Sequence, residues 1–247
     1  MQTIVFNRAD SRKAFTLIEL IVVLTILVGL AGVLIPTVTN MIGRTSRSTS
    51  AINISEIAGA VQRYEAIYGS YPDNFDSLMT DLVGTALNTL NSGLTAVTDD
   101  VTLDEDTLAT LNNAGIINVG IHAEDDTTFM LPTSTALTDE TVLLGLTAAH
   151  QVALGLETTG TLGKYVVLGI GTLSSLNGTI MVDAPVHFPR DNATNPELVY
   201  SRFLAIFQIT DGTDPLTDAR FVGILAPDGA GLSSQLSGFF NISANQQ

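Results

Sequence analysis

Residues 14–35 have the sequence AFTLIELIVVLTILVGLAGVLI, an apolar run with one carboxylate, Glu19, near its start. From Leu20 to Ile35 there is no charged residue. A helix of the 21 residues from Phe15 to Ile35 would span about 30 Å, because each residue adds about 1.5 Å. That length matches the hydrocarbon core of a bilayer. The sequence therefore predicts a membrane-spanning helix over residues 15–35.

Charges around this run predict its orientation. Three basic residues precede it and one acidic residue opposes them: Arg8, Arg12 and Lys13 against Asp10. The next basic residues, Arg44 and Arg47, lie farther from the end of the run. The positive-inside rule then puts the N-terminus in the cytoplasm and most of the chain outside. A secretory signal peptide has a shorter apolar region and a small-x-small cleavage site, which this run lacks.

Glu19 distinguishes the run from a plain membrane anchor. A carboxylate costs roughly 2.5 to 3.5 kcal/mol at the centre of a bilayer and less near its edge. An anchor gains nothing from that cost, so an ionisable residue in a span needs a partner. Glu19 is therefore the main candidate functional residue of the sequence.

The segment from Ala14 to Leu20 resembles the processing site of type IV pilins and type II secretion pseudopilins. The resemblance implies that a prepilin peptidase cuts between Ala14 and Phe15 and methylates the new amine of Phe15. It also implies that Glu19 is the assembly glutamate and that Pro36 is the proline that bends or locally melts the helix. The chain departs from the family pattern at Ala14, where the family usually has glycine.

The position of Glu19 agrees with this role. It lies about one helical turn after Phe15, in the first turn of the helix, where the macrodipole favours negative charge. In a packed filament, Glu19 would pair with the Phe15 amine of a neighbouring subunit. Removing one partner of a buried ion pair typically costs about 3 to 5 kcal/mol. We therefore expect Glu19→Ala to impair assembly more than membrane insertion.

The helix is predicted to continue to about residue 70. Apolar residues recur at spacings of three and four, which indicates a helix lying on a core: Ile54, Ile57, Val61, Tyr64 and Tyr68. Glu56, Arg63 and Glu65 fall off this stripe and should face water, and Gly69 should end the helix. Residues 63–79, RYEAIYGSYPDNFDSLM, also resemble the helix exit of major pseudopilins. The alternative is a simple helix stop followed by a core tyrosine.

Residues 71–247 are predicted to form one globular α+β head, in which the long helix packs on an antiparallel sheet as in the pilin fold. The strands are predicted from runs rich in β-branched and aromatic residues: Ile116–Ile121, Thr128–Leu131, Tyr165–Ile170, Thr179–Val182, Val199–Ile209 and Phe221–Ala226. Two helices are predicted over Asp104–Asn113 and Thr141–Gly155. Residues 80–160 would be a large insertion.

The chain is acidic and contains no cysteine. It has 25 Asp and Glu residues against 10 Lys and Arg residues, a formal net charge of −15. Such a surface repels nucleic acid, so direct nucleic-acid binding is not expected. The absence of a disulfide in an exported head favours a pseudopilin, because many adhesive pilins close a C-terminal loop with one.

Calcium is the one cofactor that the sequence leaves open. Asp211, Asp214 and Asp218 supply hard oxygen ligands in a late loop, where the resemblance to major pseudopilins implies a calcium site. The spacing does not match an EF-hand. Solvated loop acids are the alternative interpretation.

Catalysis has little support. The three histidines, His122, His150 and His187, are scattered, and no recognised hydrolase motif is present. A surface-loop position is the expectation for His187. Gly169-Ile-Gly171 lacks the third glycine of a dinucleotide site and is expected to serve strand packing.

The sequence therefore predicts a non-enzymatic structural subunit of a type IV pilus-like or type II secretion pseudopilus filament. Residues 1–14 would be the leader, 15–70 the long helix and 71–247 the head. Expected partners are other pilins or pseudopilins, the prepilin peptidase, the inner-membrane assembly platform and membrane lipid. The precursor would span the inner membrane once with a periplasmic head, before joining a periplasmic or surface filament. The alternative is a membrane-anchored binding or hydrolytic domain. The N-terminus does not separate secretion, surface and DNA-uptake filaments.

Overall fold

The computed structural model describes residues 16–123, 132–156, 163–187 and 199–241. These ranges form two compact units, divided between Ile42 and Gly43, with the helix α1 running through the division. The elements, in chain order, are α1 (Leu17–Tyr68), β1 (Phe75–Asp76), α2 (Ser92–Thr95), β2 (Thr98–Thr102), α3 (Glu105–Asn113), β3 (Asn118–Ile121), β4 (Thr133–Ala136), β5 (Val142–Leu146), α4 (Ala148–Ala153), β6 (Tyr165–Gly169), β7 (Leu204–Asp211), β8 (Asp214–Leu225) and α5 (Leu232–Asn241). The chain is thus a mixed α/β protein.

The first unit consists of the N-terminal part of α1. Leu17–Ile35 is long and apolar enough to cross a membrane, and none of this stretch is buried within the protein. Its side chains are mostly more than half exposed, as at Leu17 and Ile35. The helix is continuous through position 36, so it does not show the local melting implied for Pro36. Just after it, the Thr37 hydroxyl donates to the Val33 carbonyl at 3.1 Å.

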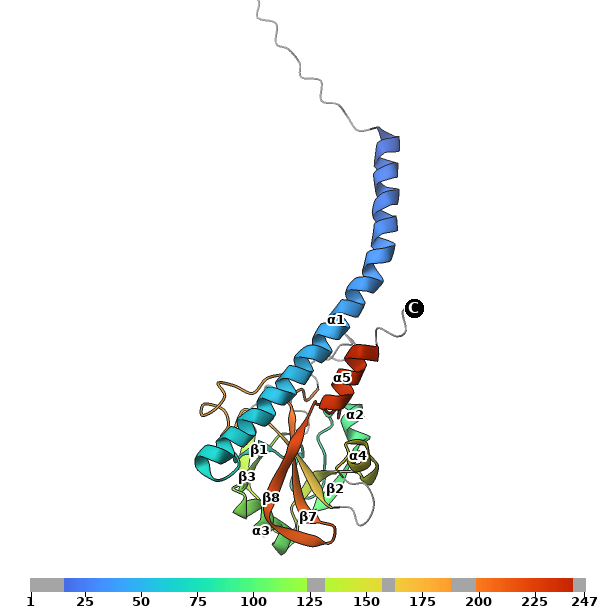
Figure 1. The fold of residues 1–247 in the computed structure, drawn as a ribbon. Helices are drawn as coiled ribbons and strands as arrows, with labels where there is room; N and C mark the ends of the chain where they lie inside the picture. The colour runs from blue at the N-terminus through green and yellow to red at the C-terminus, as the bar shows by residue number, and fades with distance from the viewer. Residues whose placement is uncertain (1–15, 124–131, 157–162, 188–198, 242–247) are drawn as a thin grey trace, which may run out of the picture. The chain divides into compact units, whose positions relative to one another are not determined.

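In the second unit, the remaining part of α1 runs alongside the sheet (Figure 1). The predicted apolar stripe is confirmed at Ile54, Ile57 and Val61, which are buried in the main core. Tyr64 is half-buried, whereas Tyr68 is exposed and lies outside that core. The helix ends at Tyr68, and Gly69 has a φ of +72°, the left-handed conformation that glycine adopts most readily. The predicted helix stop is confirmed.

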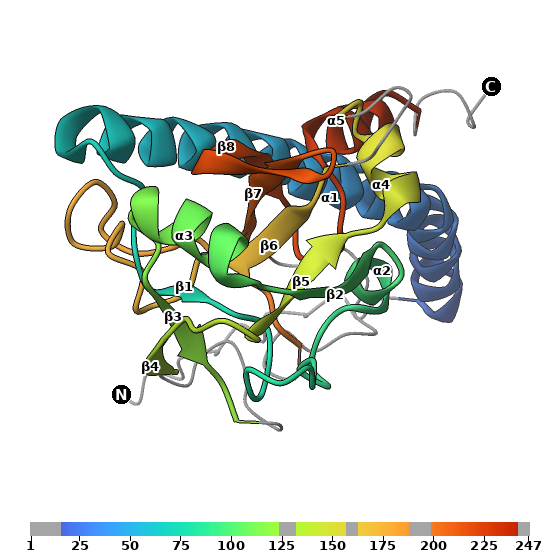
Figure 2. The ribbon, with the colours of Figure 1, turned by 90° about the horizontal axis from the view of Figure 1, so that it is seen from below.

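Within the described ranges, eight strands form one mostly antiparallel sheet with β6 near its centre. One edge of β6 pairs along its whole length with β7, and β8 follows β7. The other edge is shared, because Val166 pairs with Gly145 of β5 and Gly169 pairs with Asp76 of β1. The sheet therefore forks here into a β5–β2 branch and a β1–β3–β4 branch. Figure 2 shows β5, β6, β7 and β8 side by side.

Both faces of the central strands are buried. Val166 and Leu168 belong to the core that also contains the α1 stripe and Leu111 of α3. Tyr165 and Val167 alternate with them and belong to a second core, built with Leu94 of α2 and the segment around residues 78–90. A central sheet covered on both faces is the expected result when each strand is apolar on both sides.

Some element predictions are confirmed and others are wrong. Predicted Asp104–Asn113 and Tyr165–Ile170 match α3 and β6 to within one residue. The helix predicted over Thr141–Gly155 is wrong, because Val142–Leu146 is the buried strand β5 and only Ala148–Ala153 is helical. The strand predicted over Thr179–Val182 is wrong as well: the segment makes only an isolated bridge at Met181, and Val182 is 98% exposed.

The remaining strand predictions differ in extent. Val199–Ile209 becomes a strand only from Leu204, and Phe221–Ala226 is the later part of the longer β8. Predicted Thr128–Leu131 falls mostly outside the described residues. Residues 80–160 supply β2 to β5 to the same sheet and cores as the rest of the head.

Candidate functional site

The candidate site at the N-terminus lies at the start of α1. Ala14 and Phe15, the predicted cleavage pair, are outside the described residues, and Thr16 is the first residue described. The Thr16 amide and hydroxyl both donate to Oε2 of Glu19, at 2.8 and 2.9 Å. The Thr16 hydroxyl lies 3.4 Å from the Glu19 amide, which donates to it. This reciprocal pattern is a capping box, which satisfies donors that the first turn of a helix leaves free.

The capping box gives Glu19 a defined geometry in the single chain. One carboxylate oxygen is engaged by Thr16, and the side chain as a whole is exposed. Its neighbours Leu17, Ile18 and Leu20 are exposed as well, with more than half of each side chain accessible. Glu19 is therefore a carboxylate presented on an uncovered apolar helix.

The three calcium candidates do not converge on one point. Asp211 and Asp214 pair across the turn that joins β7 to β8, and Asp218 lies farther along β8. Within the described ranges, no group of three His, Asp or Glu side chains is placed to hold a metal ion. Calcium binding by these residues stays a prediction.

The three histidines all contact other parts of the fold. His150, on α4, lies with Nε2 3.1 Å from the Gly229 carbonyl oxygen. His187 lies 3.3 Å from the Ser50 hydroxyl on α1 and packs edge-on against the Phe203 ring. Burial lowers the pKa of His187, and nearby Asp228 raises it by a smaller amount. His187 lies in a loop, as expected, but its side chain is partly buried, because it contacts Ser50 of α1 and the ring of Phe203.

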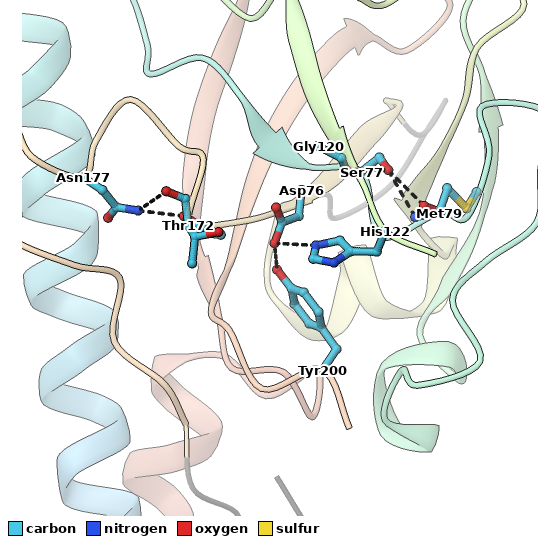
Figure 3. A network of polar contacts seen from close by, with 9 residues as sticks. Asp76, Ser77, Met79, Gly120, His122, Thr172, Asn177 and Tyr200 are labelled. Atoms are coloured by element: carbon cyan, nitrogen blue, oxygen red, sulfur yellow. Dashed lines mark hydrogen bonds and ion pairs between the residues drawn. The ribbon is translucent and has the colours of Figure 1, made fainter. Parts of the chain in front are cut away.

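A buried polar network at the sheet fork was missed by sequence reasoning (Figure 3). Asp76 of β1 is 1% exposed, and His122, which follows β3, is 3% exposed. Oδ2 of Asp76 lies 3.2 Å from Nε2 of His122 and accepts a hydrogen bond of 2.7 Å from the Tyr200 hydroxyl. Burial, reinforced by the Asp76 carboxylate, raises the pKa of Tyr200 well above its ordinary value, so the phenol keeps its proton and donates.

Glycines make room for this network. A side chain on Gly171 would collide with the carboxylate of Asp76, and one on Gly169 would collide with the Tyr200 hydroxyl. Gly169-Ile-Gly171 therefore serves close packing, which confirms the interpretation of this pair as packing residues. Oδ1 of Asp76 is buried and has no hydrogen-bond partner among the described residues.

The buried network of Asp76, His122 and Tyr200 links segments of the fold to one another. Asp76, His122 and Tyr200 join β1, the end of β3 and the segment before β7, which are far apart in the sequence. All three side chains are at least 97% buried, so a substrate in solvent would not reach them. Two cavities lined by described residues, of about 480 and 570 Å³, include none of the three.

Fold and site together define a class: an α/β chain with an antiparallel-rich sheet and an N-terminal apolar helix long enough to cross a membrane. Comparisons with protein-family models, with curated proteins and with solved structures give no match for this chain.

Proposed function

We propose that this chain is a structural subunit of a filament of the type IV pilus or type II secretion pseudopilus kind. The observation that carries the proposal is α1 itself. One helix of 52 residues begins with a capped carboxylate, continues through an uncovered apolar stretch and ends as a core element of a folded head. An apolar helix surface needs lipid or other apolar helices around it. In the membrane, lipid would surround the helix, and in a filament the same helices of neighbouring subunits would do so.

Glu19 has the central role in this proposal. In the precursor, it caps the helix through Thr16 and lies near the edge of the membrane. Cleavage between Ala14 and Phe15 would create an amine one residue before Thr16. That amine of one subunit and Glu19 of its neighbour would then neutralise each other inside the filament and fix the axial register.

The proposed subunit acts with the prepilin peptidase, the inner-membrane assembly platform and other pilins or pseudopilins. Its precursor has a cytoplasmic N-terminus, in keeping with Arg8, Arg12 and Lys13 before the span. The competing hypothesis is a membrane-anchored binding or hydrolytic domain. The two differ in what they require of Glu19, since an anchor does not need a carboxylate.

Substitution of Glu19 tests the proposal. We expect Glu19→Ala to stay in the membrane fraction while the yield of sheared filaments falls at least tenfold, because an unpaired amine would be buried. Glu56→Ala is the matched control, because Glu56 is an exposed residue of the same helix beyond the apolar stretch. If Glu19→Ala yields as many sheared filaments as Glu56→Ala, the role assigned to Glu19 in assembly is wrong. If the wild-type chain yields no sheared filaments, the filament proposal is wrong and the anchor hypothesis gains support.

A further inference from the structure

The head carries negative charge that its own cations do not neutralise. Of the 25 acidic and 10 basic residues of the chain, most of the acidic ones follow Tyr68. The basic residues described beyond Tyr68 are Lys164, Arg202 and Arg220, and Arg202 is buried. Among the described residues beyond Tyr68, two cations are exposed, Lys164 and Arg220, whereas most of the carboxylates are exposed.

Ion pairs do little to reduce this charge. Among the described residues, one carboxylate lies within 4.0 Å of a Lys or Arg side chain, namely Asp183 beside Arg202. Carboxylates on neighbouring segments are exposed together without such a partner: Asp99 and Asp100 on β2, and Asp139 and Glu140 in the turn before β5. The segments are held side by side where the Glu140 amide donates to the Leu103 carbonyl at 3.0 Å.

We infer that packing of neighbouring heads in the filament requires cations from the medium. This inference rests on the proposed function, since it concerns contacts between subunits. Like-charged heads repel each other over about one Debye length, which is about 8 Å at 0.15 M ionic strength and about 30 Å at 0.01 M. The apolar helices of neighbouring subunits attract each other, whereas their acidic heads repel each other. Hard inorganic cations that screen or bridge the carboxylates would reduce this repulsion enough for the subunits to stay associated.

Sheared filaments of the full-length chain provide the test. They are transferred to NaCl solutions of about 0.5 M and about 0.01 M ionic strength, and the sedimentable fraction is measured. We expect that fraction to fall about tenfold at the lower ionic strength. A parallel series in CaCl₂ at matched ionic strength identifies the mechanism: equal dissociation in both salts indicates screening, and retention in CaCl₂ indicates bridging.

A charge variant sharpens the test. Asp99→Asn, Asp100→Asn, Asp139→Asn and Glu140→Gln together remove four negative charges at exposed positions. We expect the NaCl concentration for half-dissociation to fall at least twofold, whereas the uncharged control Thr95→Asn with Thr102→Asn leaves it unchanged. Filaments that sediment equally at every ionic strength would overturn this inference and leave the filament proposal intact. Absence of filaments in all salts would overturn both.

Discussion

Asp76 is a carboxylate that is 1% exposed in the interior of the head. A buried carboxylate needs polar partners: the Tyr200 hydroxyl donates to Oδ2, and Nε2 of His122 lies 3.2 Å from the same oxygen. Gly171 lies against the same group, and no larger residue would fit there. Asn74, directly before β1, and Leu78, two residues after it, have φ values of 59° and 63°, which L-residues rarely adopt. The network and these turns hold the short strand β1 in the fork of the sheet.

Removal of the Tyr200 hydroxyl should therefore weaken the head. Tyr200→Phe removes the hydrogen bond that the Tyr200 hydroxyl donates to Oδ2 of Asp76, and a buried group that loses its partner typically costs about 1 to 3 kcal/mol. The measurement is the free energy of urea unfolding of the full-length chain in detergent. Tyr68→Phe, at an exposed tyrosine, is the matched control. Equal stability of the two variants would contradict a structural role for the network.

His187 should make the stability of the head depend on pH. Burial lowers its folded-state pKa, so the unfolded chain binds a proton more readily than the folded one. Stability is then fully present above the unfolded pKa of about 6.5 and decreases as the pH falls below it, until the folded pKa is reached.

The corresponding measurement is the thermal midpoint between about pH 7.5 and pH 5.5, where few carboxylates titrate. We expect the wild-type midpoint to fall more over this range than that of His187→Asn, which has no imidazole. A parallel decrease in both proteins would show that His187 is not the group responsible.

At the scale of secondary structure, α1 combines two surfaces in one helix. Up to Ile42, the described side chains are exposed and mostly apolar, whereas Ile54, Ile57 and Val61 are buried in the head. The second surface is the more easily tested, because buried and exposed isoleucines lie on the same helix. Ile57 is 1% exposed and Ile67 is 60% exposed.

We expect Ile57→Ala to destabilise the head by about 2 to 5 kcal/mol, since it removes buried methyl groups and leaves a cavity. Ile67→Ala should change the free energy of unfolding by less than about 0.5 kcal/mol, as is usual at exposed positions. Urea unfolding monitored by circular dichroism provides both values. A loss at Ile67 as large as that at Ile57 would mean that the outer face of α1 is also covered.

The sequence was most informative where a signal was local. The α1 stripe has helical spacing, Gly69 is a recognisable stop, and Asp104 is an N-cap whose carboxylate accepts from the Thr107 amide at 2.9 Å. Val142–Leu146 was wrongly assigned because a short apolar run fits a helix or a buried strand equally well. This segment is a strand because it pairs with β2, where Gly145 allows the close approach of Val101. That pairing joins residues far apart in the sequence, so the local pattern does not reveal it.

The polar network could not be predicted for the same reason. Asp76 and Tyr200 are separated by 124 positions, and β1 has two residues, too few for a periodic pattern. The glycine pair at 169 and 171 was the one available signal, because closely spaced glycines in a strand mark a close approach of other groups. Glu19, in contrast, stands out in the sequence as a lone charge in an apolar run.

At the scale of the whole molecule, the two units differ in what they need from their surroundings. The described part of the first unit exposes an apolar helix that no other part of its own unit covers. The second unit has its own two-sided core and a highly charged surface. In our proposal, the first unit supplies the attraction between subunits and the second unit supplies the filament surface.

The central claim is that the first 14 residues are a leader removed before assembly. Intact-mass spectrometry of the full-length gene product, extracted from membranes, tests it most directly. The account predicts a chain that begins at Phe15 and carries one added methyl group on its amine. A chain that retains residues 1–14 in the membrane would contradict the account and leave an anchored domain as the better description.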